Sequence, residues 1–285
     1  MDIFSLLDYK KIKSLTGLKN HISTIRYFNN DKDYNEYLIA ADINYMVIIW
    51  DITDDHNIKY QIETQYDSYI YSCLIVFPLN INNNYFITST CNVSKTNSKS
   101  ATKIYLLDNG KFHKYINDSN NNEIYYLLSW YNIKNNKYYI IQFAYNKIII
   151  NNLLEDELYS ELVHEPEGIH FSGFIYNKDD NDFLCSSSHN GYITLWDLYN
   201  KNIFKVINTN NCFLAHIIQW NEEYIIVADL YNKCFKIVNL EDVMIKDIKK
   251  QHNGYLRCIK KIYHHKYGES LLSAAQDKTI KLWKL

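Results

Sequence analysis

Residues 273–285 read SAAQDKTIKLWKL. A run of small residues enters the polar corner around Asp277, and a short apolar run ending in Trp283 follows it. Such runs on either side of a polar corner predict two short β-strands joined by a tight turn. The pattern returns at residues 40–52, 186–198 and 227–240, which read AADINYMVIIWDI, SSSHNGYITLWDL and VADLYNKCFKIVNL, and in weaker form around 101–108 and 146–150. The chain is therefore a tandem array of one β unit.

The spacing of the corners gives the length of the unit. The corner residues fall at Asn44, Asn146, Asn190, Asn232 and Asp277, with separations of 102, 44, 42 and 45 residues. The first gap has room for two units, the earlier of which contains the polar run 91–101. We interpret residues 91–101 as a polar loop insertion in repeat 2 that leaves the strands around it unchanged.

These repeats resemble the WD40 repeat family, and the resemblance covers nearly the whole chain. In that family each repeat of about 40 to 45 residues supplies one four-stranded blade of a β-propeller. The resemblance implies an all-β chain forming a single propeller domain over residues 1–285.

The resemblance also implies a hydrogen-bonded framework inside each blade, because buried polar groups require partners. In the last repeat it consists of His252, Ser273, Asp277 and Trp283. The corresponding residues are His164, Ser186, Asn190, Trp196 and Asp197 in the fourth repeat, and His21, Asn44, Trp50 and Asp51 in the first. Asn in place of Asp weakens the charge-assisted part of such a network. If Trp283 is fully buried, Trp283→Ala should lower the stability by roughly 3 to 5 kcal/mol.

Six blades are the preferred count, because six repeats each contain three strands. Residues 1–15 then supply terminal strands that close the last blade, with residues 11–15 pairing beside residues 279–283 and covering an exposed edge. A seventh blade built from the terminal pieces, or a blade completed by a strand from a partner, is the alternative.

The composition limits the class of protein. The chain of 285 residues has 27 Tyr, 7 Gly and 2 Pro, and Arg26 and Arg257 are its only arginines. An A+T-biased genome explains this usage, and Asn then takes the place of Gly in turns. The first residues show no secretory leader, and no stretch of about 18 apolar residues follows. We expect an intracellular protein, cytoplasmic rather than nuclear, with no membrane partner.

No motif points to catalysis. The sequence contains no Gly-rich phosphate loop, no Gly-x-Ser-x-Gly elbow and no His-Glu-x-x-His helix. The six cysteines are scattered and are interpreted as small buried hydrophobes, and the pair His264-His265 as part of an exposed turn. No catalytic residue, cofactor, metal or small-molecule ligand is predicted.

The predicted function is a noncatalytic scaffold or adaptor that binds other proteins of a multisubunit complex. Two alternatives stay open: an RNA-binding propeller, suggested by the many Tyr and Lys residues, and an enzyme using the central pocket. The net charge of -2 disfavours nucleic acid. No residue of a binding surface is assigned.

Overall fold

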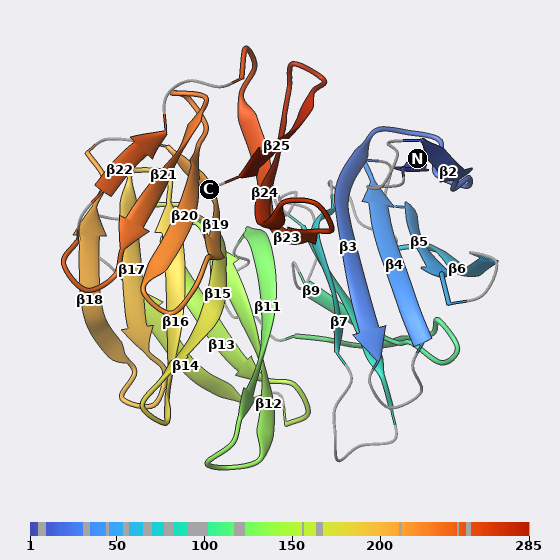
Figure 1. The fold of residues 1–285 in the computed structure, drawn as a ribbon. Helices are drawn as coiled ribbons and strands as arrows, with labels where there is room; N and C mark the ends of the chain where they lie inside the picture. Colours follow the sequence, from blue (N-terminus) through green and yellow to red (C-terminus); the bar gives the residue numbers. More distant parts are fainter. Residues whose placement is uncertain are drawn as a thin grey trace. The chain divides into compact units, whose positions relative to one another are not determined.

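The computed structural model describes residues 1–4, 10–30, 35–43, 46–53, 57–64, 70–76, 83–90, 102–116, 123–155, 157–163, 168–210, 213–243, 245–248 and 252–284. Their regular secondary structure consists of the strands β1 to β25 (Figure 1). Within these ranges, the structure has no helix of the length and apolarity that crossing a membrane requires. The predicted insertion at residues 91–101 lies outside the described residues.

The chain divides into two compact units. Unit 1 comprises Met1–Tyr145 and Ile149–Tyr159, and unit 2 comprises Asn146–Ile148 and Ser160–Leu285. This division does not test whether residues 1–285 form a single domain, which stays a prediction.

Unit 1 contains a two-stranded sheet and three four-stranded sheets, which we call the first, second and third blades. The two-stranded sheet is β1 (Asp2–Phe4) and β2 (Lys11–Ser14). The first blade is β3 (Ile22–Asn30), β4 (Asn35–Asp42), β5 (Met46–Asp51) and β6 (Asn57–Glu63). The second is β7 (Ile70–Val76), β8 (Tyr85–Thr90), β9 (Thr102–Leu106) and β10 (Phe112–Tyr115). The third is β11 (Ile124–Asn132), β12 (Lys137–Ala144), β13 (Lys147–Asn152) and β14 (Leu158–Val163), and the division between the units passes through β13 and β14.

Unit 2 contains the fourth, fifth and sixth blades. The fourth is β15 (His170–Lys178), β16 (Asn181–Ser188), β17 (Tyr192–Asp197) and β18 (Asn202–Asn208). The fifth is β19 (Leu214–Gln219), β20 (Tyr224–Asp229), β21 (Cys234–Asn239) and β22 (Ile245–Ile248). The sixth has three strands, β23 (Leu256–His264), β24 (Gly268–Ala275) and β25 (Ile280–Lys284).

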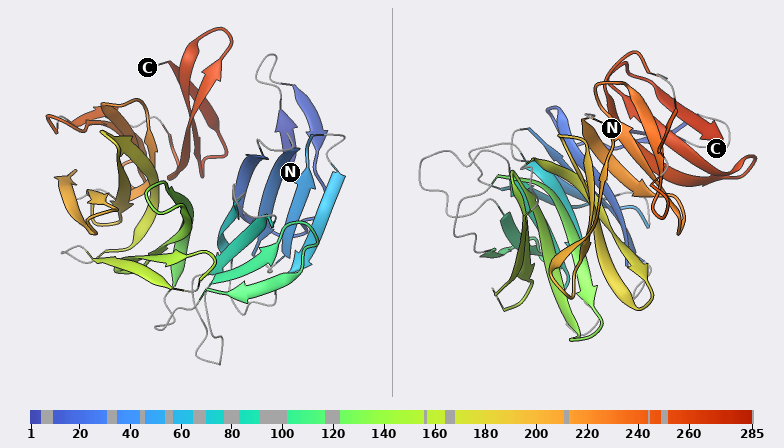
Figure 2. Two further views of the ribbon diagram at one scale, coloured as in Figure 1. Left: turned by 90° about the horizontal axis from the view of Figure 1, so that it is seen from below. Right: turned by 90° about the vertical axis from the view of Figure 1, so that its left-hand side faces the viewer.

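In every blade the strands follow one another in chain order, and neighbouring strands pair side by side as in a meander (Figure 2). The short connections make this order favourable, because antiparallel strands need only a tight turn between them. The described residues are thus all-β, with six blades of the β-propeller type. The predicted fold class and the preferred blade count are confirmed.

A β-bulge marks the same place in all six blades. The pairing register between the first and second strands shifts just after the first paired residue, at Ile22, Ile70, Ile124, His170, Leu214 and Leu256. A bulge increases the local twist and redirects the side chains that follow it. The recurrence at one structural position shows that the blades are copies of one unit, even where their sequences share little.

The core of each unit lies between successive blades. In unit 1, Ile39, Ile49, Cys73 and Phe86 belong to one buried cluster shared by the first and second blades. In unit 2, a cluster shared by the fifth and sixth blades includes Phe235, against which Trp283 packs. The second and third strands supply most of these side chains, and this burial on both faces explains their continuous apolar runs.

The N-terminal strands pack on the first blade. The backbone N–H of Leu15 donates to the carbonyl of Met1 at 2.7 Å, and β2 pairs with β1. The Leu15 side chain is buried in a cluster with Ala40, Ile48 and Trp50. In the sixth blade β25 is the last strand of its sheet, and its side chains are only partly buried or exposed. Closure of that blade by residues 1–15 stays a prediction.

Candidate functional site

In the sixth blade, four side chains that the sequence singles out form one hydrogen-bonded chain. The Trp283 indole Nε1 donates to the Ser273 hydroxyl at 2.7 Å, and Ser273 Oγ lies 2.8 Å from His252 Nε2. His252 Nδ1 lies 3.1 Å from the Asp277 carboxylate. Thr279, which the sequence reasoning missed, adds a hydroxyl that donates to Asp277 at 2.6 Å.

The direction of these bonds follows from the donors that each group has. Because the indole can only donate, Ser273 accepts from Trp283 and has its own hydrogen left for His252 Nε2. His252 then carries its proton on Nδ1 and donates it to Asp277. This series of hydrogen bonds from Trp283 to Asp277 therefore satisfies each buried donor, and it acts as a cooperative structural element.

The Asp277 carboxyl has a depressed pKa. The Thr279 hydroxyl, the backbone N–H groups of Asn253 and Thr279, and His252 hold the pKa of the Asp277 carboxyl well below its usual range. A depressed pKa stabilises the fold above the unfolded-state value of about 4, and this contribution is lost as the pH falls toward the folded-state pKa.

We expect Asp277→Asn to lower the melting temperature at pH 7, because the amide replaces a carboxylate that accepts charge-assisted bonds. The difference from the wild type should shrink as the pH is lowered from 5 to 2, because over this range the unfolded state takes up a proton on Asp277 that the folded state does not. Thermal melts across this range are the measurement. Asp180→Asn, the same change at an exposed turn residue, is the control. A wild-type to Asp277→Asn difference that does not vary with pH would contradict the assigned role.

Gly254 allows two segments of the sixth blade to approach closely. A Cβ atom at this position would lie 2.4 Å from the backbone nitrogen of Asp277. Backbone atoms cannot give way as the end of a side chain can, so the turn must shift. We expect Gly254→Ala to lower the free energy of unfolding by about 1–3 kcal/mol. Urea unfolding measures this, and Lys278→Ala, an exposed change in the same turn, should stay within about 0.5 kcal/mol of the wild type.

The fourth blade keeps the Trp and Ser part of the framework. Trp196 Nε1 donates to Ser186 Oγ at 2.9 Å, and the Ser188 hydroxyl donates to Asn190. His164 lies outside the described residues. His170, which the sequence analysis did not select, packs its ring against Trp196 at 6.3 Å and 65°, close to the 6.4 Å and 70° of His252 against Trp283.

In the first blade the structure places His21 apart from the buried framework. Its backbone carbonyl accepts from Ile43, and Tyr255 makes the equivalent bond with Gln276 in the sixth blade. His21 therefore corresponds to Tyr255, three residues after His252, and it is exposed. Trp50 is 1% exposed and packs in an apolar cluster beside Ala40, which has no hydroxyl.

Asn44 lies outside the described residues. At this corner the carboxylate of the residue two positions earlier accepts the hydrogen bonds described. Asp42 is 1% exposed and accepts from the backbone N–H of Met46 at 3.1 Å and from Asn20 Nδ2 at 3.3 Å. The sequence signal was present, since an acid ends the small-residue strand in AADINY.

In the fifth blade, too, an acidic residue at the end of the second strand accepts the hydrogen bonds of the corner. Asp229 is fully buried and accepts from both the backbone N–H and the side-chain amide of Asn232, at 3.1 and 2.8 Å. Leu230 donates to Phe213 as Gln276 donates to Tyr255, so Tyr231 stands where Asp277 stands in the sixth blade. The assignment of Asn232 as the equivalent corner residue is therefore one position too late.

The acidic residue after Trp has a separate role. Asp197 accepts from the backbone N–H groups of Tyr199 and Asn200 at 2.9 and 2.8 Å, and Asp51 accepts from Thr53 at 3.1 Å. Each closes the turn into the fourth strand. Asn152 and Asn239 occupy the same place at the ends of β13 and β21, and each accepts from two backbone N–H groups.

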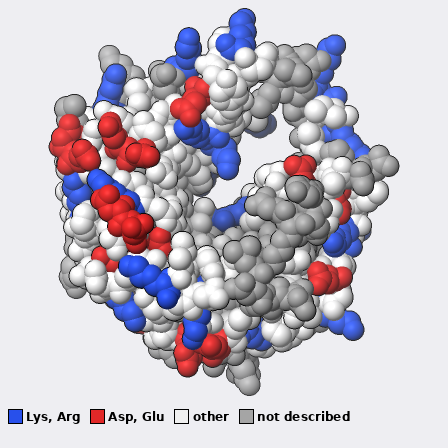
Figure 3. All heavy atoms as spheres, turned by 60° about the horizontal axis from the view of Figure 1, so that its bottom comes forward, with Lys and Arg blue, Asp and Glu red and all other residues white. Residues whose placement is uncertain are grey.

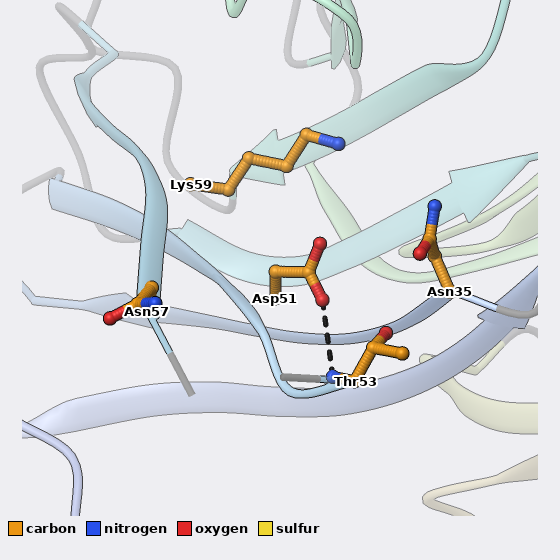
Figure 4. Close-up of a pocket in the computed structure, with 5 residues that line it drawn as sticks. All are labelled: Asn35, Asp51, Thr53, Asn57 and Lys59. Carbon is orange, nitrogen blue, oxygen red and sulfur yellow. Dashed lines mark hydrogen bonds between the residues drawn. The ribbon is translucent and has the colours of Figure 1, made fainter. Parts of the chain in front are cut away.

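A polar hollow of about 310 Å³ lies on the first blade. It is lined by Asn35, Asp51, Thr53, Asn57 and Lys59 (Figure 4). Lys59 Nζ donates to the Tyr37 hydroxyl at 2.9 Å. Burial lowers the pKa of Lys59, but this hydrogen bond and nearby groups including Asp51 outweigh it, so the pKa is raised. Lys59 is therefore a cation at neutral pH and an unsuitable base or nucleophile.

Two of the described thiols, Cys73 and Cys185, have raised pKa values because they are buried. Cys73, Cys185 and Cys234 are buried, as predicted, whereas Cys258 is exposed and Cys91 and Cys212 lie outside the described residues. Burial raises the pKa of the Cys73 thiol to about 12, although Arg26 opposes this. Across the described ranges, no group of three or more His, Cys, Asp or Glu residues is placed to hold a metal ion.

Basic and acidic side chains are interspersed on the face shown in Figure 3. This mixture fits the nearly balanced charge of the chain, 30 basic against 32 acidic residues.

The comparison with family models agrees with the geometry of the last blade. Residues 245–284, which span β22 to β25, match the model described as WD domain, G-beta repeat. No curated protein matches the chain. The matched segment contains all four side chains of the hydrogen-bonded series that runs from Trp283 through Ser273 and His252 to Asp277. The resemblance to the WD40 repeat family is therefore confirmed: residues 245–284 match a WD40 repeat, in a chain whose described sheets form six propeller blades.

Proposed function

We propose that the chain is a noncatalytic scaffold or adaptor that mediates protein–protein interactions within a larger intracellular assembly. The WD40 propeller fold is commonly an interaction scaffold and typically noncatalytic, which supports this role. A rigid set of strands holds connecting segments in fixed positions, and such segments are where binding residues concentrate.

The observation that carries the proposal is the apolar character of those connecting segments. Ile133 is 73% exposed, Tyr231 59%, Tyr145 53% and Leu154 45%, and all four lie between strands rather than within them. Turn residues that serve only as connections are usually polar. Burial of such exposed apolar side chains against another protein would be favourable, because it removes apolar surface from water.

Capture of the tagged full-length chain from its native cells, at moderate salt and with or without nuclease, tests the proposal. We expect the chain to elute in size-exclusion chromatography well above its 34.0 kDa mass, with protein partners that resist nuclease. A partner set released by nuclease would instead indicate an RNA-dependent assembly. Elution at the mass of the free chain would contradict the scaffold role.

A further inference from the structure

Five rings form a continuous aromatic row across the three blades of unit 2. The row begins at the rings of Phe171 and His189, which lie 5.1 and 6.0 Å from the ring of Phe213. Phe213 is 4.9 Å from Tyr231, and Tyr231 is 5.8 Å from Tyr255. All five residues stand at or near strand ends: Phe171 near the start of β15, His189 after β16, Phe213 before β19, Tyr231 between β20 and β21, and Tyr255 before β23.

The outer part of the row is open to solvent. Tyr231 is 59% exposed and Tyr255 is 40% exposed. Among the described residues, neither hydroxyl has a hydrogen-bond partner. The two rings therefore present apolar faces together with two available donors, a combination typical of protein interfaces.

The charges around the row disfavour a cationic partner. Asp229, two residues before Tyr231, and Asp277, which follows the residue that bonds to the Tyr255 carbonyl, are both engaged in turns of their own blades. The cation at the row is Lys233, whose Nζ lies 5.8 Å from the Tyr255 ring centre and donates to the carbonyl of Asn253 at 2.9 Å. Lys233 favours an acidic group beside the rings.

The ring orientations favour a peptide over a nucleic acid. Successive planes from Phe213 to Tyr255 meet at 68° and 76°. Bases stacked along a strand require ring faces that are roughly parallel, usually in a positively charged groove. Polyproline II segments dock on aromatic side chains without requiring parallel ring faces.

We propose that this row, on Phe213, Tyr231 and Tyr255, binds a proline-rich peptide segment in the polyproline II conformation with an acidic residue next to it. One turn of that helix spans about 9 Å, so prolines three residues apart reach alternate rings such as Phe213 and Tyr255. Its backbone carbonyls are free of internal bonds and accept from the two tyrosine hydroxyls. The acidic residue pairs with Lys233. The inference rests on the proposed scaffold function and names a partner class for it.

Fluorescence anisotropy with the full chain tests the proposal. The probe is a labelled peptide of ten residues containing two Pro-x-x-Pro units and two flanking Glu residues, compared with a Gly/Ser peptide of equal length and charge. We expect saturable binding of the proline peptide alone. Tyr231→Ala and Tyr255→Ala should each weaken it about tenfold, as expected for aromatic anchors. Tyr231→Phe should weaken it about threefold through loss of the hydroxyl.

Tyr263→Ala provides the matched control. Tyr263 lies on β23 in the same unit and is 79% exposed, but its ring is not part of the row. Its substitution should leave binding unchanged, and Lys233→Ala should weaken binding of the proline peptide, because the flanking Glu residues lose their partner. Equal binding of both peptides, or an equal loss in Tyr263→Ala, would overturn the proposal. A labelled uridine decamer that binds more tightly than the peptide, with strong salt dependence, would overturn it in favour of RNA.

Failure of this inference is distinguishable from failure of the scaffold function. The Tyr231→Ala chain is captured from native cells alongside the wild type. If the peptide does not bind while large nuclease-resistant assemblies persist in both captures, the row is not the peptide site and the scaffold role stands.

Discussion

Trp196→Ala is expected to lower the free energy of unfolding by about 3–5 kcal/mol. The indole is 1% exposed, donates to Ser186 and packs against His170. Alanine leaves a large cavity between strands that cannot close, and it removes the donor to a buried hydroxyl. The midpoint of urea unfolding measures the loss.

Trp196→Phe separates the two contributions, because it retains most of the apolar contact and removes the indole N–H. The free energy of unfolding of Trp196→Phe should lie between that of Trp196→Ala and that of the wild type. Trp283→Ala should also cost less than Trp196→Ala, since Trp283 lies on a strand whose side chains are only partly buried. Equal losses at the two positions would contradict this ranking. The value of 3 to 5 kcal/mol that the sequence suggested for Trp283 assumed full burial, and that assumption is wrong.

Arg26→Ala should be the second large change, with a loss of about 2–4 kcal/mol. Arg26 lies on β3, and its guanidinium donates to the carbonyl of Leu127 on β11 at 3.0 Å and to the Ser72 hydroxyl on β7 at 3.3 Å. It also stacks over the Tyr126 ring at 4.2 Å. One side chain thus connects the first strands of three blades in unit 1.

Arg26→Lys tests the planar geometry, because an ammonium keeps the charge without the fork of donors. It should recover less than half of the stability lost in Arg26→Ala. Arg257→Ala, at the other arginine of the chain, is the control, since Arg257 is exposed. Both are measured by urea unfolding, and equal losses at Arg26 and Arg257 would contradict the connecting role.

The repeated β units were predictable because strand and corner patterns are local. Thirteen residues around Trp196 or Trp283 suffice to predict two strands and a turn, and the spacing then gives six blades. The Ser-to-Trp hydrogen bonds followed from the same copies. These features depend on side-chain alternation and turn chemistry, which a short window of sequence contains.

Contacts between distant segments were not predictable in this way. Arg26 and Leu127 are 101 residues apart, and nothing near either one indicates the other. His170 lies within a strand rather than before it, so the spacing of histidines to corners did not select it. Asp42 and Asp229 were not predicted because the repeat pattern places its polar residue at the corner, whereas in these two blades an acidic residue at the end of the strand accepts the hydrogen bonds.

The turns into the fourth strands have a consequence for surface charge. Asp51, Asn152, Asp197 and Asn239 all close these turns through an acceptor oxygen, which carboxylates and amides both supply. The geometry requires the oxygen and not the negative charge. At Asp51 and Asn239 the acceptor oxygen alone makes these bonds, so Asp and Asn can replace one another there at small cost to the fold, and each exchange changes the net charge by one. Such an exchange alters the field at one blade end, so the local electrostatic character of the surface is adjustable separately from the architecture.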